Sequence, residues 1–379
     1  MIESFFASPA AMIVLTGALV GIAGSILGTF LVLRRNAMLS DAIGHSIVFG
    51  IVVVWLITRA QSGPAQIIGA ALTGVITVGL IELLANSRRV KYDAAIGLVF
   101  PVLFAAGVLL LNLYARDVHI DTHTVLLGEI GFVWLDTMDV AGMAVPSSVV
   151  WMSVLTLVDA AFIGLFYKEL KLATFDRQLA AALGLAPILI FYSLLALTSM
   201  TAVAAFDAVG AVLFIAFVIV PPSAAYLLTD RLFPMLLIAA TIGVLSSFTG
   251  YAAAVAMDVS IGGMMAVMTG VFLALAFLLG PRHGLVAQHL LARTQRYQDE
   301  CRTLVVHLYE HENTPSSREE NVTQALRGHL RWDTAKAEAV LERSLAQGLV
   351  VRDGSMLHLT AKGRAAARQL LEPWAPQEA

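Results

Sequence analysis

The sequence predicts an all-α polytopic membrane protein that ends in a small α+β domain. Of its 379 residues, 58% are hydrophobic and only 13% are charged, whereas soluble domains carry about a quarter charged residues. At roughly 20 residues per spanning helix, the chain offers about nine apolar stretches of sufficient length. Charged residues become frequent only near the carboxyl end. We therefore divide the chain into a transmembrane domain, residues 1–285, and a polar domain, residues 286–379.

Short polar segments separate the predicted spans. The opening residues carry Glu3 rather than a basic cluster, so we expect the first apolar run to stay in the membrane as a span. Glycines recur along this run, a pattern typical of closely packed membrane helices. The spans are expected near residues 10–33, 40–58, 64–85, 94–114, 147–167, 183–204, 207–228, 234–256 and 261–280.

Lysine and arginine set the predicted orientation. If the spans alternate in direction, only Arg59 and Arg116 fall on one side of the membrane, and the other side is richly basic. Cytoplasmic loops carry the excess of basic residues. We therefore expect the N-terminus outside and everything after Arg282 in the cytoplasm. The residues on the basic side are Arg34, Arg35, Arg88, Arg89, Lys91, Lys168, Lys171, Arg177, Arg231 and Arg282.

Asp41 and His45 lie four residues apart at the start of the second predicted span. Residues at this spacing share one face of a helix, so both side chains can point at one object. Ionisable groups inside a membrane segment are costly and usually face a cavity or a partner. Of the nine histidines, His45 alone falls within a predicted span. The pair is a candidate metal-ligand set; a helix cap at Asp41 and a packed imidazole at His45 remain the alternative.

A long connection, residues 115–146, joins the fourth and fifth spans on the outer side. Its HIDTH motif places His119, Asp121 and His123 on one edge of an extended segment, as a possible external entry site for a metal. The following LLGEIGFVW is expected to form an apolar helix lying partly in the membrane, with Glu129 facing inward. A solvated loop with short interfacial helices is the alternative.

Two further carboxylates fall at membrane level. Asp207 lies in AVAAFDAVGAVL, between two spans that would otherwise merge, and is either a pathway carboxylate or the cap of the next helix. Asp159 lies inside a span, where we expect a polar partner on a neighbouring helix.

The sequence also excludes some classes of site. It contains no G-x-x-x-x-G-K-[ST] loop, so a nucleotide site of that kind must belong to another subunit. No H-E-x-x-H or G-x-S-x-G motif is present either, and we do not expect an enzyme. The single cysteine, Cys301, excludes an internal disulfide and a cysteine-rich metal site.

The last part of the chain, from residue 285, carries twelve basic and twelve acidic residues. Helices are expected near residues 295–311, 319–330, 334–347 and 361–372, with a hairpin between Gly348 and Gly363 that turns at Asp353-Gly354. Its charge is balanced, and the helix before the hairpin holds more acids than bases. A nucleic-acid partner is therefore not expected, because DNA readers carry a basic footprint. His307, Glu310 and His311 either sense a metal or form a solvated face.

Four stretches resemble, in order, the permease subunits of the ABC transporter family that imports manganese, zinc and iron. They are LVLRRNAMLSDAIGHSIVFGI, then YDAAIGLVFPVLFAAGVLLL with the later LLGEI, then AVGAVLFIAFVIVPPSAAYLL, and finally VSIGGMMAVMTGVFLALAFLLGPRHG. The likeness covers roughly residues 10–285. The tail departs from the short ending typical of this family. Its three helices, hairpin and closing helix resemble a winged-helix domain, particularly those of metal-dependent repressors.

The resemblance implies a multi-pass protein of the bacterial plasma (inner) membrane, with the fold of an ABC importer permease. It implies a homodimer, or a dimer with a related permease, around a central pore. Two cytoplasmic ATPase subunits and an extracellular metal-binding protein are the other implied partners. Asp41 and His45 match residues that line the translocation path. The segment that matches the coupling region against the ATPase comprises Ala224, Ala225, Tyr226, Leu227, Leu228, Thr229, Asp230 and Arg231.

A divalent cation that crosses the bilayer must exchange its water shell for protein oxygens and nitrogens, because a bare ion in hydrocarbon is prohibitively costly. We expect no permanently bound cofactor, only the transported metal at Asp41, His45, Asp207 and Glu129. Manganese is favoured over zinc on the carboxylates of LLGEI and FDAVG, and iron is possible. The alternatives are a membrane-anchored metal-responsive transcriptional regulator and a secondary transporter that works without an ATPase. We favour a regulatory or docking role for the tail.

Overall fold

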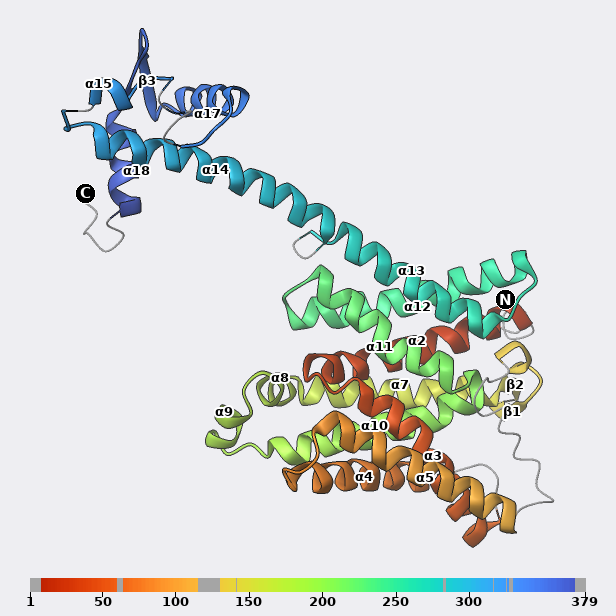
Figure 1. The fold of residues 1–379 in the computed structure, drawn as a ribbon. Helices are drawn as coiled ribbons and strands as arrows, with labels where there is room; N and C mark the ends of the chain where they lie inside the picture. Colours follow the sequence, from red (N-terminus) through yellow and green to blue (C-terminus); the bar gives the residue numbers. More distant parts are fainter. Residues whose placement is uncertain are drawn as a thin grey trace. The chain divides into compact units, whose positions relative to one another are not determined.

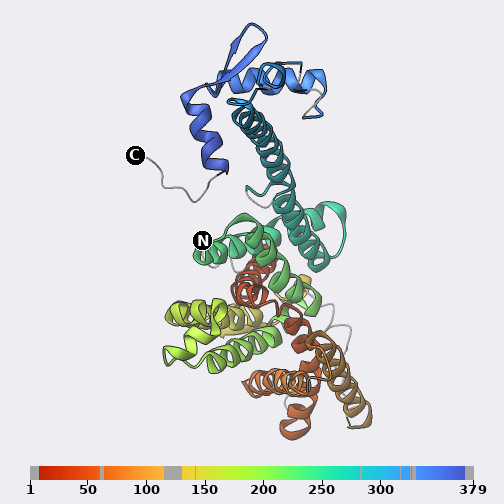
Figure 2. The ribbon, with the colours of Figure 1, turned by 60° about the vertical axis from the view of Figure 1, so that its left-hand side comes forward.

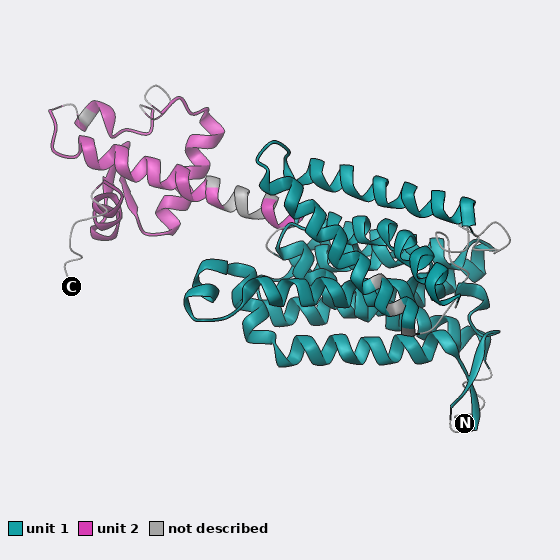
Figure 3. Ribbon diagram, turned by 90° about the horizontal axis from the view of Figure 1, so that it is seen from below, with its two compact units in different colours: residues 1–284 teal, residues 285–379 magenta. Residues whose placement is uncertain are grey.

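The chain of the computed structural model divides into two compact units, residues 1–284 and residues 285–379 (Figure 3). The structure describes residues 8–59, 64–114, 130–140, 142–281, 284–315, 317–324, 326 and 330–371.

The first unit is a bundle of long apolar helices (Figure 1). Within the described residues, eight helices are long and apolar enough to cross a membrane, and they match eight of the nine predicted spans. The remaining prediction, 64–85, falls on α4, of which Ala71–Asn86 qualifies as a shorter apolar helix. The eight are α2 (Pro9–Leu33), α3 (Met38–Thr58), α5 (Tyr92–Tyr114), α7 (Ser147–Leu165), α10 (Pro187–Val209), α11 (Ala211–Leu228), α12 (Leu232–Met257) and α13 (Ile261–Leu279); α4 is Pro64–Asn86.

Helix α2 is the most buried of these helices and packs on α7, α11 and α12. Its glycines permit this approach. A Cβ atom at Gly28 would lie 1.9 Å from the carbonyl oxygen of Val218 on α11, and one at Gly21 would lie 3.0 Å from the backbone of Gly243 on α12. The backbones therefore touch directly, as the glycine pattern of this helix predicts, because small residues let membrane helices come close enough for van der Waals packing.

Helices α3, α4 and α5 group along one side of the unit, with α4 also against α10 (Figures 1 and 2). Polar side chains tie these helices together. The Thr77 hydroxyl on α4 donates to the Ser46 hydroxyl on α3 at 2.8 Å, and the Tyr192 hydroxyl on α10 donates to Glu82 on α4 at 2.7 Å. These bonds satisfy groups that would otherwise be costly in hydrocarbon, and the bond to Ser46 ties α4 to the helix that carries Asp41 and His45.

The end of α2 is anchored by Arg34, which caps the helix. Its guanidinium lies 4.6 Å from the ring centre of Phe191 on α10 and donates from Nε to the Thr174 hydroxyl at 3.3 Å. Burial, together with the nearby charge of Arg177, lowers the pKa of Arg34 to about 10. The basic residue that helped to predict the orientation thus also packs against neighbouring helices.

Short elements close the two ends of the bundle (Figure 1). At one end lie α8 (Tyr167–Phe175) and α9 (Arg177–Ala182). At the other lie a 3-10 turn, η1 (Ile130–Phe132), and an antiparallel hairpin of β1 (Thr137–Val140) and β2 (Met143–Pro146). The hairpin was not predicted. Its signal is the Asp139-x-x-Gly142 turn, where the Asp139 carboxylate accepts from the Gly142 N–H at 2.7 Å and Gly142 has φ +83°.

The second unit packs three helices and a hairpin around one apolar core (Figure 3). The predicted hairpin is present, with Gly354 at φ +62° in its turn. The helix predicted near 319–330 is wrong at residues 321–324. Residues 321–324 are not helical, because Val322 pairs with Met356 and competes with the helical bonds. The described elements are α14 (Leu285–His311), α15 (Ser317–Glu320), α17 (Thr334–Ala346), β3 (Val350–Asp353), β4 (Met356–Leu359) and α18 (Ala361–Leu371).

Candidate functional site

Asp41 and His45 form a contact pair on α3. Asp41 lies in the first turn of the helix, and the Nε2 atom of His45 lies 3.3 Å from an Oδ1 oxygen of Asp41. The four-residue spacing on a helix predicts this contact, and the structure confirms it. The side chains are 40% and 31% exposed respectively, although their neighbours Ala42, Ile43 and Ser46 are buried. The pair therefore occupies the one face of this turn that the chain leaves open.

Two phenylalanines of α5 frame the imidazole. The ring of Phe100 is stacked on that of His45, with centroids 5.6 Å apart, and the ring of Phe104 meets it edge-on at 6.0 Å. Aromatic pairs in these geometries restrict the rotation of the ring. Sequence reasoning did not assign these residues a role. Their signal is the F-x-x-x-F spacing in VFPVLF, which puts both rings on one helix face.

The pair lies on a helix of the apolar bundle. His45 is seven residues into α3, which corresponds to about 10 Å along the axis at a rise of 1.5 Å per residue. A carboxylate oxygen and an imidazole nitrogen at this spacing are ligands suited to divalent transition metals. Two such ligands can hold an ion weakly, as a site of passage requires.

Asp207 does not join this pair in any described contact. It lies in the last turn of α10, with an exposed side chain, and the chain breaks only at Gly210, which has φ +83°. The prediction that Asp207 could cap the following helix is therefore wrong, because Gly210 holds that position. Its neighbour Phe206 faces the pair's helix instead, since a Cβ at Gly44 would lie 3.0 Å from the Phe206 ring.

Asp159 on α7 has the polar partner that was predicted. It is fully buried, and one of its oxygens accepts a hydrogen bond from the Thr201 hydroxyl of α10 at 2.8 Å. Its other oxygen, Oδ1, has no hydrogen-bond partner in the described part of the chain. The bond links α7 to α10 across the bundle and accounts for a carboxylate at this depth.

The predicted coupling segment lies at the turn between α11 and α12. Ala224 and Ala225 are fully buried, against Ile242 and Met235 of α12 respectively. Tyr226, by contrast, is 55% exposed. The segment then leaves the helix at Thr229, and both Asp230 and Arg231 are exposed. Only part of this segment is thus available to another protein.

Four predicted ligand residues lie outside the described residues of the structure. These are His119, Asp121, His123 and Glu129.

A bundle of apolar helices that sets a carboxylate and an imidazole on an open face at membrane depth is typical of a membrane transport protein. Comparison with known protein families identifies the class of transport protein. A model of the ABC 3 transport family matches residues 10–280, and the chain belongs to that family.

Individual relatives extend the likeness. The chain is 49% identical over 292 residues to the manganese transport system membrane protein MntD of Bacillus subtilis, a match that covers 76% of this chain and 98% of that protein. It is 43% identical over 360 residues to the zinc transport system membrane protein TroD of Treponema pallidum, covering 95% of this chain and 98% of that protein. Among solved structures, PsaBC from Streptococcus pneumoniae in complex with Fab has the same fold, with a TM-score of 0.62 at 24% identity over 75% of this chain and 98% of that one.

The two relatives differ in how much of this chain they match. A match over 95% of this chain must include most of residues 285–379. The Bacillus protein is almost fully covered by only 76% of this chain, so it lacks about a quarter of the length. Most of the second unit is therefore shared by at least one relative.

Proposed function

We propose that this chain is the membrane-spanning permease subunit of an ATP-driven importer of a divalent transition metal. Membership in the ABC 3 transport family supports this proposal, as do relatives named for manganese and zinc transport. The chain is a transport subunit rather than an enzyme. Its sequence holds no phosphate-binding loop, so ATP hydrolysis belongs to separate subunits.

The observation that carries the proposed path is the exposure of Asp41 and His45 on a membrane helix. A charged or polar pair at this depth is costly against lipid, so another protein surface must cover it. A second permease chain related by a two-fold axis meets this need and brings a second carboxylate and a second imidazole. Helix α5, which carries Phe100 and Phe104, is itself sparsely buried in one chain, as expected of a helix at a dimer interface. We propose a homodimer, or a dimer with a related permease.

In such a dimer, the four side chains replace water molecules around a hydrated ion as the ion passes through. Two carboxylates and two imidazoles suit manganese, iron or zinc. Because half of these ligands are carboxylates, manganese is favoured. Asp207 and Glu129 belong to the proposed path as outer carboxylates, separate from the central pair. The histidines and aspartate of HIDTH form the proposed outer entry.

The proposed orientation places the N-terminus outside and the second unit in the cytoplasm, by the excess of basic residues on one side. The turn between α11 and α12 then faces the cytoplasm. Its exposed residues Tyr226, Asp230 and Arg231 are the proposed contact with the ATPase. On the opposite side, an extracellular metal-binding protein is the proposed donor of the ion.

The second unit is proposed to be a winged-helix-like regulatory or docking module. The order α14, α17, β3, β4, α18 supports this, as does the extra pairing of Val322 with the hairpin. In that arrangement α17 would be the helix that reads a partner. Its exposed face carries Glu338 and Glu342, and acidic residues repel the phosphates of DNA. We therefore propose a protein partner rather than the transcriptional-regulator alternative.

The path is tested by replacing its two ligands. Asp41→Ala and His45→Ala are each expected to abolish uptake of radiolabelled manganese and zinc in cells that lack the native chain, because the ion loses half of its protein ligands. Asp93→Ala is the matched control, since Asp93 also lies in the first turn of a membrane helix and is exposed. Membrane levels are compared by immunoblot. Normal uptake in both ligand variants would remove the pair from the path.

The ATPase contact is tested separately. Arg231→Glu reverses an exposed charge at the α11–α12 turn and is expected to lower metal-dependent uptake several-fold, because the transport and hydrolysis steps uncouple. ATP hydrolysis and metal flux are measured together in reconstituted vesicles. An unchanged ratio of ions moved to ATP hydrolysed would place the contact elsewhere.

A further inference from the structure

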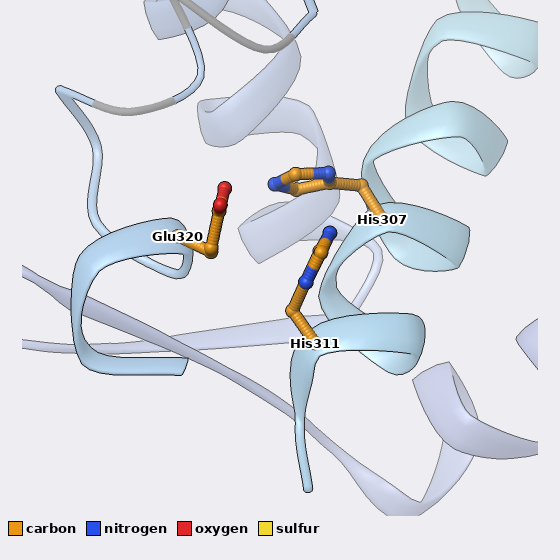
Figure 4. A group of neighbouring side chains, drawn as sticks. All are labelled: His307, His311 and Glu320. Carbon is orange, nitrogen blue, oxygen red and sulfur yellow. The ribbon is translucent and has the colours of Figure 1, made fainter. Parts of the chain in front are cut away.

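A second group of metal-ligand side chains lies in the carboxyl-terminal unit, far along the sequence from Asp41 and His45. His307 and His311 project from α14, and Glu320 projects toward them from α15 (Figure 4). Each of the three offers one ligand atom, and these atoms all lie within 4.8 Å of one another. Among the described residues, no other group of three or more such side chains comes together in this way.

The two histidines are placed by α14 itself. They are four residues apart, so their rings lie on one face of the helix, with centroids 4.8 Å apart. His307 is only 9% exposed, and the adjacent Leu308 is part of the apolar core. The helix cannot rotate these rings into solvent without pulling its core residues apart, so the pair is held where it is.

Glu320 is brought back to the histidines by the turn that follows α14. The turn is fixed at both ends. At its start, the Arg364 guanidinium of α18 binds both carboxylate oxygens of Glu312, at 2.8 and 2.9 Å from Nε. At its end, the carbonyl oxygen of Asn321 accepts from the Leu357 N–H of β4 at 2.8 Å. The position of Glu320 is therefore set by backbone contacts on its C-terminal side and does not depend on a metal.

The chemistry of the group is specific. Two imidazoles and one carboxylate form a three-ligand set known from zinc sites, in which a fourth position stays open to water. In such sites ligand atoms lie about 2.0–2.2 Å from the metal, and hence about 3.3–3.6 Å from one another in a tetrahedron. The atoms here, all within 4.8 Å of one another, must therefore draw closer to share one ion. The Nδ1 atom of His311 is buried and has no hydrogen-bond partner within the described part of the chain. A buried polar atom of this kind calls for a partner, and a bound cation would supply one.

We propose that His307, His311 and Glu320 bind one divalent transition-metal cation in the second unit. The two nitrogen ligands select zinc, or another late first-row metal, over manganese and magnesium, which prefer all-oxygen surroundings. Bound metal joins the end of α14 to α15 and thereby stiffens the turn between them. The site is separate from the proposed transport path and does not depend on that path being correct.

The test uses the full-length protein, purified in detergent without a histidine tag. An Asp41→Ala, His45→Ala background removes the membrane pair as a competing site. Zinc retained after dialysis is counted by mass spectrometry, and cobalt is added as a coloured probe of tetrahedral geometry. This background is expected to retain one equivalent of zinc per chain more than variants of the proposed site. His311→Gln and Glu320→Gln are each expected to lose that equivalent together with the visible cobalt absorption.

Glu310→Gln and Glu319→Gln are the matched controls. Both are exposed acids, one residue before His311 and Glu320 respectively, and both variants are expected to bind as the background protein does. Thermal unfolding provides a second measure of binding, because a ligand that binds only the folded state raises Tm. Zinc should raise Tm in the background protein and in both controls, but not in Glu320→Gln, whose side chain keeps its shape. Equal zinc content and equal Tm shifts in Glu320→Gln and the controls would overturn the proposal.

Discussion

The two ligand groups of this protein use the same helical spacing and differ in what surrounds them. Asp41 and His45 are 40% and 31% exposed and contact each other on one helix. His307 is 9% exposed, and a third ligand reaches its pair from a different element. Spacing of four residues brings two ligands together in both places. The neighbouring elements decide whether the result is an open pair or a converging set of three.

This difference matters for what each group can do with an ion. Passage across a membrane requires binding that is favourable enough to admit the ion and weak enough to release it. An open pair meets that requirement because each chain supplies only two ligands. A set of three that converges from two elements favours retention, as in zinc sites that hold the metal with three protein ligands. The protein would then hold a metal in one unit and pass one through the other.

Converting the open pair into a set of three is the strongest test of this comparison. Phe100→His places a second imidazole, as the third ligand, beside His45, where the stacked ring now lies with its centroid 5.6 Å away. Uptake is expected to fall about tenfold or more, since 1.4 kcal/mol of extra binding slows release by that factor. Zinc retained by the purified protein should rise at the same time.

Phe100→Leu separates the effect of the new ligand from loss of the aromatic ring. It removes the stacked ring without adding a nitrogen, so uptake should fall less and retained zinc should stay unchanged. If Phe100→His behaves as Phe100→Leu does, the number of ligands is not what distinguishes the two groups.

A smaller effect is expected from moving α5, the helix that carries Phe100 and Phe104. Gly107 on α5 faces the α3 backbone, and a Cβ there would lie 2.8 Å from the Phe49 nitrogen. Gly107→Ala should push α5 away from His45, lower uptake several-fold and destabilise the protein by about 1–3 kcal/mol, as overpacking does. Gly97→Ala on the same helix is the control, because a Cβ there meets nothing within 4 Å. Uptake and thermal unfolding are compared in the two variants, and equal results would mean that the α3–α5 contact is not needed.

The smallest effect is expected at the ion pair that supports the second group. Arg364 holds Glu312 through Nε and Nη2, and that carboxylate raises the pKa of the Arg364 guanidinium. The pair is partly exposed, and such pairs add little stability. Arg364→Gln should therefore lower Tm only slightly, and high salt should remove the difference because it screens the attraction in the native protein. A large fall in Tm that persists in salt would show a structural role beyond this pair.

Several features of the candidate sites could be predicted because they are local. The contact between Asp41 and His45 follows from four-residue spacing on one helix. The polar partner of Asp159 was expected from the cost of a carboxylate in hydrocarbon, but its identity, Thr201, was not. Glu310 was grouped with His307 and His311 from sequence proximity. The structure instead leaves Glu310 exposed and supplies Glu320, because adjacent helical residues point about 100° apart.

By itself, the sequence determined that this is a multi-helix membrane protein, where most of its spans lie and which residues could act as ligands in pairs. These properties depend on the length of apolar runs and on the repeat of a single helix, and both can be read from neighbouring residues. The tertiary structure alone decided that Phe100 and Phe104 contact the ring of His45, that Ala224 and Ala225 are buried in the predicted coupling segment, and that Glu320 completes a set of three. Those contacts join elements distant in the chain, and close packing of helices and the path of connecting turns select them.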